Sequence, residues 1–244
     1  VARSRWHETD PIGGPAGQGP CLDGAVRIAT TLSPQALHRE NQQIEVAANR
    51  TRGEHWAART LDVDLLLYGD AAMDTDQLKI PHPRMSFRRF VLEAAQEVAG
   101  DMRVPGLEWT VGQLWRRLNR GTEQAAFVGN DSERVAELAR RLAQRFGCPV
   151  LTRDAIAEID RPAPTIAILH QRDDQLKRAK LTVYFGAEVA RGKEIANPDG
   201  LVTASSGKLA RARPGPTLLL GPITVDEAYR EAAAAMQSVW PALR

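Results

Sequence analysis

Two aspartates stand two positions apart inside an apolar run, TLDVDLLLYG, at residues 60–69. In a strand, side chains at positions i and i+2 point to the same face, so Asp62 and Asp64 would project together. Two neighbouring carboxylates repel each other and lose hydration unless a cation lies between them. Mg²⁺ suits such a pair, because this hard ion binds few carboxylates and takes its remaining ligands from phosphates and water. The spacing therefore indicates a metal site for phosphate chemistry.

Positively charged residues gather around this pair in the sequence. Those between positions 50 and 89 that could face it are Arg50, Arg52, His55, Arg59, His82, Arg84, Arg88 and Arg89. Arginine grips phosphoryl oxygens with paired N–H groups, and phosphoryl transfer depends on positioning and charge neutralisation. The alternative is a surface strand whose aspartates form ion pairs with arginines, which the D-x-D spacing alone does not exclude.

The composition limits the classes of partner. The chain has 244 residues, of which 43% are hydrophobic, enough for one large domain or two ordinary ones with a real core. Its net charge is +2, and neither half is a basic block of the kind that binds nucleic acid. No stretch is long and apolar enough for a membrane span. Cys21 and Cys148 are far apart, so we expect no disulfide framework and a cytoplasmic location. Because the chain begins at Val1, we expect that the native N-terminus is missing.

The elements that must position the aspartates belong to a mixed first half. Its predicted strands cover residues 1–9, 24–32 and 60–69, and its predicted helices cover residues 33–50, 90–99 and 110–119. Ser33 and Pro34 are typical of the first positions of a helix. Strands and helices without strict alternation predict an α+β domain.

The second half changes character. Uninterrupted apolar runs at residues 125–130, 149–153, 164–171, 181–188 and 216–222 accompany amphipathic segments at 131–147 and 224–240. Apolar strands that alternate with helices predict an α/β domain with a parallel sheet covered on both faces. We place the boundary near residues 119–124, which gives domains 1–120 and 121–244. A Gly-, Ser- and Lys/Arg-rich segment, residues 191–215, is predicted as a long loop.

Residues 50–70 (RTRGEHWAARTLDVDLLLYGD) and 78–92 (LKIPHPRMSFRRFVL) closely resemble the 6-hydroxymethyl-7,8-dihydropterin pyrophosphokinase family. The family pattern is approximately R-x-R, W-G-x-R-T-x-D-x-D, a loop, and then P-H-P-x-M-x-x-R-x-F-V-L. The upstream segment SRWHETDPIGGPAGQ is similar to the family's S-x-x-Y-x-T-x-P-x-G, and the resemblance covers about residues 1–118. It implies a ferredoxin-like α+β domain, from which the first strand and helix of the family are absent here.

This resemblance implies an activity. Enzymes of the family transfer an intact diphosphate from ATP to the hydroxymethyl group of a reduced pterin and leave AMP, a step in tetrahydrofolate biosynthesis. Asp62 and Asp64 would hold two Mg²⁺ ions that bridge the ATP phosphates and the acceptor hydroxyl. The expected partners are the two small molecules, with no nucleic acid and no membrane.

Further residues match family positions. Arg50 and Arg59 match arginines that grip the phosphates and act in catalysis with the two aspartates. Matches to residues on the nucleotide side are Glu45, Arg52, Trp56, His82 and Arg88. Matches to the walls of the pterin pocket are Thr9, Ile12, Cys21, Asp23 and Phe90.

Two pocket positions depart from the family. Cys21 stands where an aromatic or other large residue is usual, and loses stacking of about 0.5–1.5 kcal/mol. Asp23 replaces an Asn, and an ionised carboxylate only accepts hydrogen bonds. These changes leave a second interpretation open, a catalytically impaired descendant that serves as a binding or scaffolding module.

The start of the second half resembles a P-loop kinase only in outline. An apolar strand, a glycine and an amphipathic helix follow one another, but the motif needs Gly, Lys and Ser/Thr at positions six to eight. Counted from Gly129, these positions hold Arg134, Val135 and Ala136. We therefore predict a degenerate kinase-like domain with a structural or regulatory role, and treat the SSGK at 205–208 as loop.

Overall fold

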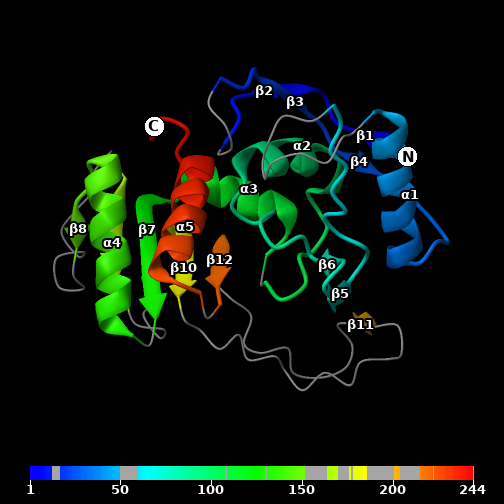
Figure 1. Cartoon of the computed structure of the whole chain (residues 1–244). Coiled ribbons are helices and arrows are strands. Elements are labelled where there is room, and N and C mark those ends of the chain that lie inside the picture. Colours follow the sequence, from blue (N-terminus) through cyan, green and yellow to red (C-terminus); the bar gives the residue numbers. More distant parts are fainter. Residues whose placement is uncertain are drawn as a thin grey trace.

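The chain folds into a mixed first half and a sheet-centred second half (Figure 1), as seen in a computed structural model. The described residues are 1–12, 17–49, 60–107, 109–129, 131–151, 164–169, 176, 178–185, 201–203, 215–221 and 223–243. Helices α4 (Ser132–Phe146) and α5 (Val225–Val239) lie on the left of Figure 1, and α1 (Pro34–Ala47) lies on the right.

Three helices form the frame of the first half. Helix α1 is Pro34–Ala47, and the Ser33 hydroxyl accepts a hydrogen bond from the Ala36 amide at 3.2 Å, as expected of an N-cap. Helix α2 is Arg89–Ala99 and helix α3 is Val111–Arg120. All three were predicted from the sequence, with boundaries that differ by one to three residues.

The strands of the first half are shorter than the sequence indicates. Strand β1 (Ala2–Arg3) pairs antiparallel with β4 (Val26–Arg27), and β2 (His7–Thr9) pairs antiparallel with β3 (Cys21–Asp23). The predicted strands at 1–9 and 24–32 therefore exist only as two- and three-residue pieces.

A third antiparallel sheet, with three strands, was not predicted from the sequence. It has the order β11-β5-β6, from β5 (Ala71–Asp74), β6 (Lys79–Ile80) and β11 (Leu201–Thr203). Strand β11 lies inside the segment that was predicted as loop, so that prediction is wrong at residues 201–203. Its pairing with β5 joins segments more than 120 positions apart, which local sequence patterns do not reveal.

The predicted strand at residues 60–69 is wrong, because the structure assigns no strand over its described residues. A strand needs a ladder of backbone hydrogen bonds to a neighbouring strand. This segment instead makes isolated hydrogen bonds to different parts of the chain. The Val63 amide donates to Glu45 Oε1 at 2.7 Å, and the His82 amide donates to the Leu66 carbonyl at 2.9 Å. The expected alternation survives, since Asp62 and Asp64 are exposed and Val63 between them is half-buried.

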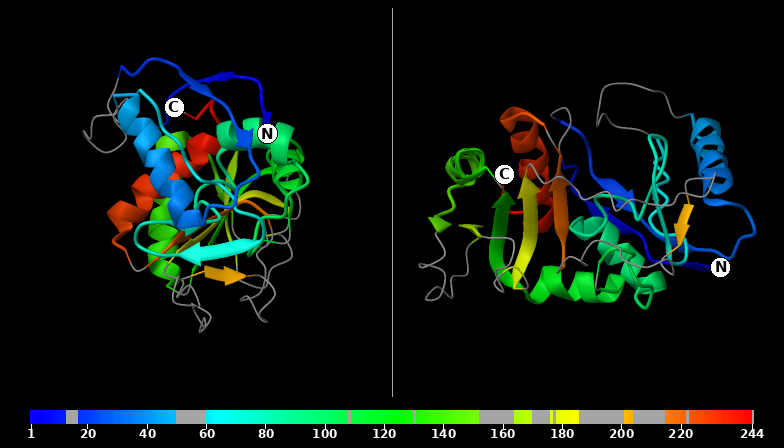
Figure 2. Two further views of the ribbon diagram at one scale, coloured as in Figure 1. Left: turned by 90° about the vertical axis from the view of Figure 1, so that its right-hand side faces the viewer. Right: turned by 90° about the horizontal axis from the view of Figure 1, so that it is seen from below.

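The second half contains the predicted parallel sheet. Its five strands are β7 (Thr122–Gly129), β8 (Val150–Leu151), β9 (Thr165–Ile168), β10 (Ala179–Phe185) and β12 (Thr217–Leu220), in the order β12-β10-β7-β9-β8. Helices α4 (Ser132–Phe146) and α5 (Val225–Val239) cover one face (Figure 2), and both contribute side chains to the apolar cluster that contains Phe127. Among the described residues, no helix has the length and apolar character needed to cross a bilayer.

One hydrophobic core crosses the predicted domain boundary. Leu92 of α2, Leu114 and Leu118 of α3, Phe127 of β7 and Met236 of α5 are all 0% exposed and belong to the same cluster. Helices α2 and α5 also pack against each other. The two-domain division stays a prediction, but the two parts share their interior.

Candidate active site

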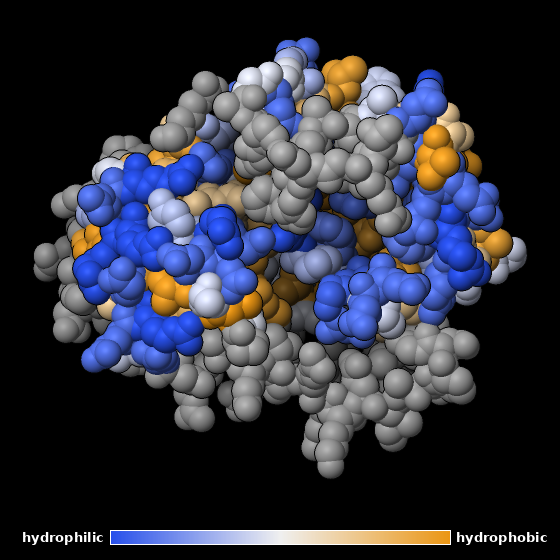
Figure 3. All heavy atoms as spheres, in the orientation of Figure 1, coloured by the Kyte–Doolittle hydropathy of each residue, from blue (hydrophilic) through white to orange (hydrophobic). Residues whose placement is uncertain are grey.

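A pocket of about 700 Å³ lies where the two halves meet. The molecular surface is hollowed in this region, between α1 and the helices of the second half (Figure 3). Strands β2 and β3, residues 60–66, the start of α2 and one face of α5 supply the walls. The predicted site residues that line it are Thr9, Ile12, Cys21, Asp23, Asp62, Asp64, Arg88 and Phe90. The structure thus brings the predicted pterin positions and the aspartate pair into one cavity.

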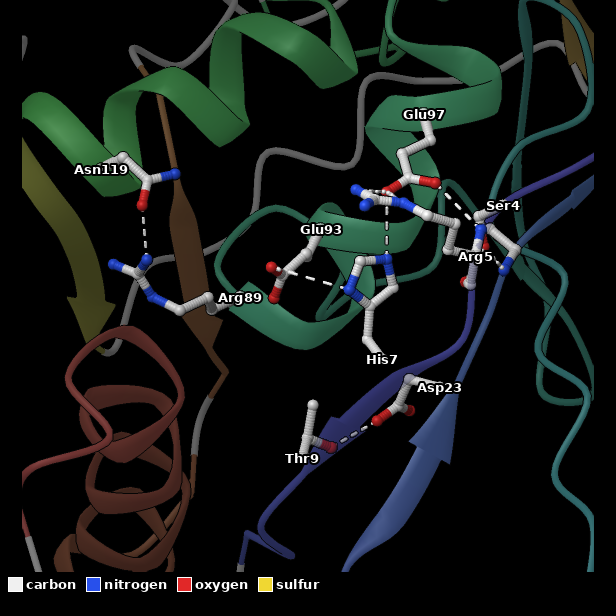
Figure 4. Close-up of polar contacts among 10 residues, drawn as sticks. Ser4, Arg5, His7, Thr9, Asp23, Arg89, Glu93, Glu97 and Asn119 are labelled. Carbon is white, nitrogen blue, oxygen red and sulfur yellow. Dashed lines mark hydrogen bonds and ion pairs between the residues drawn. The ribbon is translucent and has the colours of Figure 1, made fainter.

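The paired strands β2 and β3 form one wall. Thr9 lies opposite Cys21, and the Thr9 hydroxyl donates a hydrogen bond to the Asp23 carboxylate (Figure 4). Cys21 and Asp23 are two positions apart in a strand and both face the pocket, as the sequence predicts. Burial, and secondarily the charge of Asp23, raises the pKa of the Cys21 thiol, so this wall presents a neutral thiol beside an acceptor carboxylate.

Ion pairs fix this wall to α2. Glu97 Oε1 lies 2.9 Å from Arg5 Nη2 and 3.2 Å from His7 Nε2, and Glu93 Oε1 lies 3.7 Å from His7 Nδ1 (Figure 4). Hydrogen bonds from Arg5 lower the pKa of Glu97 to about 2. Since His7 and Thr9 belong to the same three-residue strand, these contacts hold the Thr9 side of the pocket in place.

Helix α1 helps to position the aspartate pair. Glu45 is only 7% exposed, and its carboxylate accepts the hydrogen bond from the Val63 amide, between the two aspartates. Glu45 does not line the pocket, although the sequence predicts it on the nucleotide side.

The aspartates fit the ion that the sequence predicts. Asp62 and Asp64 both face the cavity, and the described residues contain no group of three or more His, Cys, Asp or Glu side chains arranged to hold a metal ion. Two carboxylate donors without a closed protein cage suit Mg²⁺, which keeps water and phosphate ligands. The donor set therefore fits Mg²⁺ delivered with a polyphosphate.

Two predicted cationic residues lie next to the pair. His82 Nε2 is 3.7 Å from Asp64 Oδ2, and burial lowers the pKa of His82 more than Asp64 raises it. His82 does not itself line the pocket. Arg88 occupies the N-cap position of α2, and its guanidinium lies 5.6 Å from the centre of the Phe90 ring. Burial, followed by the charge of Arg84, lowers the pKa of Arg88.

Four predicted residues, Arg50, Arg52, Trp56 and Arg59, lie outside the described residues. Their roles on the phosphate side stay predictions.

Sequence reasoning missed the residues that α5 contributes. Glu231, Ala234, Ala235 and Ser238 line the pocket from the second half. Arg84, which the sequence places among the positive residues around the aspartates without assigning it a role, also lines the pocket. No sequence signal connects Glu231 with a site that lies about 150 positions upstream.

At the kinase-like start of the second half, described side chains pack against other parts of the protein. Arg134 Nη2 donates to the Ile223 carbonyl at 2.7 Å, and the guanidinium lies 4.8 Å from the centre of the Phe185 ring. A Cβ on Gly129 would lie 2.5 Å from Val135 Cγ2 and 2.6 Å from the Phe185 carbonyl oxygen. Gly129 thus allows close packing of strand and helix, which gives a structural reason for this glycine.

An aspartate pair and arginines that line one pocket are typical of a class, the enzymes that transfer phosphoryl groups with a metal ion. Comparison with known proteins narrows this class. Residues 1–100 match the model of the 7,8-dihydro-6-hydroxymethylpterin-pyrophosphokinase (HPPK) family.

Three curated relatives carry the name 2-amino-4-hydroxy-6-hydroxymethyldihydropteridine pyrophosphokinase. The protein from Pseudomonas aeruginosa is 40% identical over 105 residues, which are 43% of this chain and 64% of the relative. Those from Synechocystis sp. and Bacillus subtilis are 39% identical over 111 residues and 45% identical over 95 residues, covering 46% and 39% of this chain. The chain spans 56% of each of these two. The first part of the chain is therefore HPPK-like, and it spans less than two thirds of the relatives that it matches.

Proposed function

We propose that this protein transfers diphosphate from ATP to 6-hydroxymethyl-7,8-dihydropterin, giving the pterin diphosphate and AMP in cytoplasmic tetrahydrofolate biosynthesis. The observation that carries the proposal is the convergence of Asp62, Asp64, Arg88 and the predicted pterin-wall residues on one pocket. The ferredoxin-like arrangement of the first half and the presence of two metal ions belong to the same proposal.

The transfer joins the pterin hydroxyl oxygen to the β-phosphorus of ATP and breaks the bond from that phosphorus to the oxygen shared with the α-phosphate. AMP leaves with that oxygen, and the hydroxyl proton passes to water. Mg²⁺, when held by Asp62 and Asp64, supplies charge neutralisation for the polyphosphate.

Side chains of this protein bind the phosphates and orient the pterin. Arg88 binds phosphoryl oxygens, while Phe90 and the β2–β3 wall orient the flat ring of the pterin. Asp23 accepts hydrogen bonds from pterin N–H groups, and Thr9 holds that carboxylate in place. Helix α5 supplies one wall of the cavity through Glu231, Ala234, Ala235 and Ser238.

The test is AMP formation from ATP, measured with and without the pterin, in the wild type and in Asp62→Ala and Asp64→Ala variants. We expect pterin-dependent AMP in the wild type and a loss of at least about 100-fold in either variant, with the fold retained because one of two repelling carboxylates is removed. Asp76→Asn, an exposed aspartate away from the pocket, serves as the matched control.

Near-normal turnover in an Asp62 or Asp64 variant would contradict the metal assignment. A wild type that binds ATP and pterin but forms no AMP would favour the alternative, a binding or scaffolding module, which the substitutions at Cys21 and Asp23 permit.

A further inference from the structure

An ion pair inside the pocket joins the two halves of the chain. Arg84 Nη2 lies 2.8 Å from Glu231 Oε1 and 2.7 Å from Glu231 Oε2, so one guanidinium nitrogen serves both carboxylate oxygens. Both residues line the cavity, and their side chains are 29% and 28% exposed. Glu231 comes from α5, whereas Arg84 belongs to the loop between β6 and α2.

The charges around this pair are those of a phosphate-binding site. Arg88 lies close enough for its pKa to respond to Arg84, Asp64, Asp62 and Glu231. Two arginines and two metal-suited carboxylates in one cavity match the needs of a polyphosphate bound with Mg²⁺. Glu231 is the exception, since it adds negative charge where an anion should bind.

A carboxylate and a phosphoryl group present similar oxygen pairs to an arginine. We infer that Arg84 is a further phosphate-binding residue of this pocket, and that Glu231 of α5 occupies its guanidinium until a polyphosphate displaces it. The inference rests on the proposed function for the natural ligand, the triphosphate of ATP. Binding of that ligand would then weaken the contact of α5 with the first half.

The geometry explains why a displacement is feasible. The pair is partly exposed, so water can replace the lost contacts of the Glu231 carboxylate after Arg84 turns to the phosphate. Most of the packing of α5 lies elsewhere, on residues such as Ala232 and Met236, which are 0% exposed. Loss of the ion pair would therefore release one contact and leave the helix folded on the sheet.

The experiment uses the full chain and inorganic triphosphate as probe, with binding followed by calorimetry. We expect Glu231→Gln to tighten triphosphate binding roughly three- to tenfold, because it removes a competing charge. Arg84→Ala should weaken binding by about tenfold. Glu231→Gln should have no further effect in the Arg84→Ala background, since the competition acts through Arg84.

Asp226→Asn provides a matched control on the same helix. Asp226 is also paired with an arginine, at 2.7 Å from Arg141, but lies outside the pocket, and its substitution should leave triphosphate affinity unchanged. Unchanged or weaker binding in Glu231→Gln overturns the inference, as does absence of triphosphate binding in both the wild type and this variant. Tightening that persists without Arg84 overturns it too.

Failure of the proposed function has a separate signature. If the triphosphate results follow the expected pattern but ATP and pterin yield no AMP, the phosphate site is supported and the assigned reaction is wrong. If AMP forms but the four triphosphate affinities show no coupling, the reaction stands and the role of the Arg84–Glu231 pair falls.

Discussion

The backbone amide of Val63 donates a hydrogen bond of 2.7 Å to the buried carboxylate of Glu45. Val63 lies between Asp62 and Asp64, so this contact fixes the two aspartates relative to α1. It replaces the strand ladder that the sequence predicts for this segment. The position and orientation of the aspartate pair therefore depend on Glu45, a residue of α1.

Glu45→Ala should reduce Mg²⁺-dependent AMP formation by about tenfold to a hundredfold, because loss of a hydrogen bond to a charged group costs about 1.5–3 kcal/mol and the aspartates shift. Glu45→Gln keeps an acceptor oxygen and should restore most of the activity. Glu40→Ala, on the exposed side of α1, is the control. Equal activities in the two alanine variants would show that Glu45 does not position the pair.

The double substitution Cys21→Phe with Asp23→Asn should tighten pterin binding, since it adds a stacking partner and an amide donor. Each change contributes on the order of 1 kcal/mol, which together amounts to a factor of about 5 to 150 in affinity. The amide oxygen of Asn can still accept the hydrogen bond from Thr9. Titration of the wild type and the variant with the pterin measures the effect.

The nucleotide affinity of this double variant should stay within about twofold of the wild type, because the phosphate residues lie along the aspartate and arginine side of the pocket. Ile28→Phe adds an aromatic ring outside the pocket and controls for a general increase in apolar surface. Weaker pterin binding, or an ATP shift as large as the pterin shift, would refute this mapping of the walls.

Arg134→Ala should lower stability without changing nucleotide affinity. It removes the hydrogen bond to the Ile223 carbonyl and the contact with the Phe185 ring, a loss of about 1–3 kcal/mol that lowers Tm by a few degrees. Arg140→Ala on the same helix removes an exposed arginine and should leave Tm nearly unchanged. A large loss of ATP affinity in Arg134→Ala would reveal a nucleotide site in the second half.

From the contacts of Glu97 we expect the attachment of β2 to α2 to be sensitive to acid. Its pKa is lowered from 4.5 to about 2 in the folded protein, so the folded state holds the ionised form more strongly than the unfolded state. Its contribution to the free energy of unfolding is complete above pH 4.5 and disappears as the pH falls toward 2. Glu97→Gln should flatten the dependence of stability on pH in this window.

Chemical denaturation at several pH values measures this effect, with Glu40→Gln as the exposed control. A pH dependence for Glu97→Gln that equals the wild type would show that the Arg5 pair does not stabilise the fold.

The sequence by itself determined the helices, the parallel sheet and eight of the residues that line the pocket. Caps such as Ser33, the helical amphipathicity of residues 131–147 and the apolar runs of the second half are local signals, and local physics decides them. The spaced positions around Asp62, His82 and Arg88 likewise carry the prediction of which residues bind phosphate and pterin.

Only the tertiary structure decided how these residues meet. Pairing of β11 with β5, the bond from Val63 to Glu45 and the entry of Glu231 beside Arg84 join positions far apart in the chain. Such contacts depend on which surfaces pack together, and they cannot be inferred from the residue spacing within a single element. The shared core from Leu92 to Met236 is the physical reason that α5 reaches the pocket.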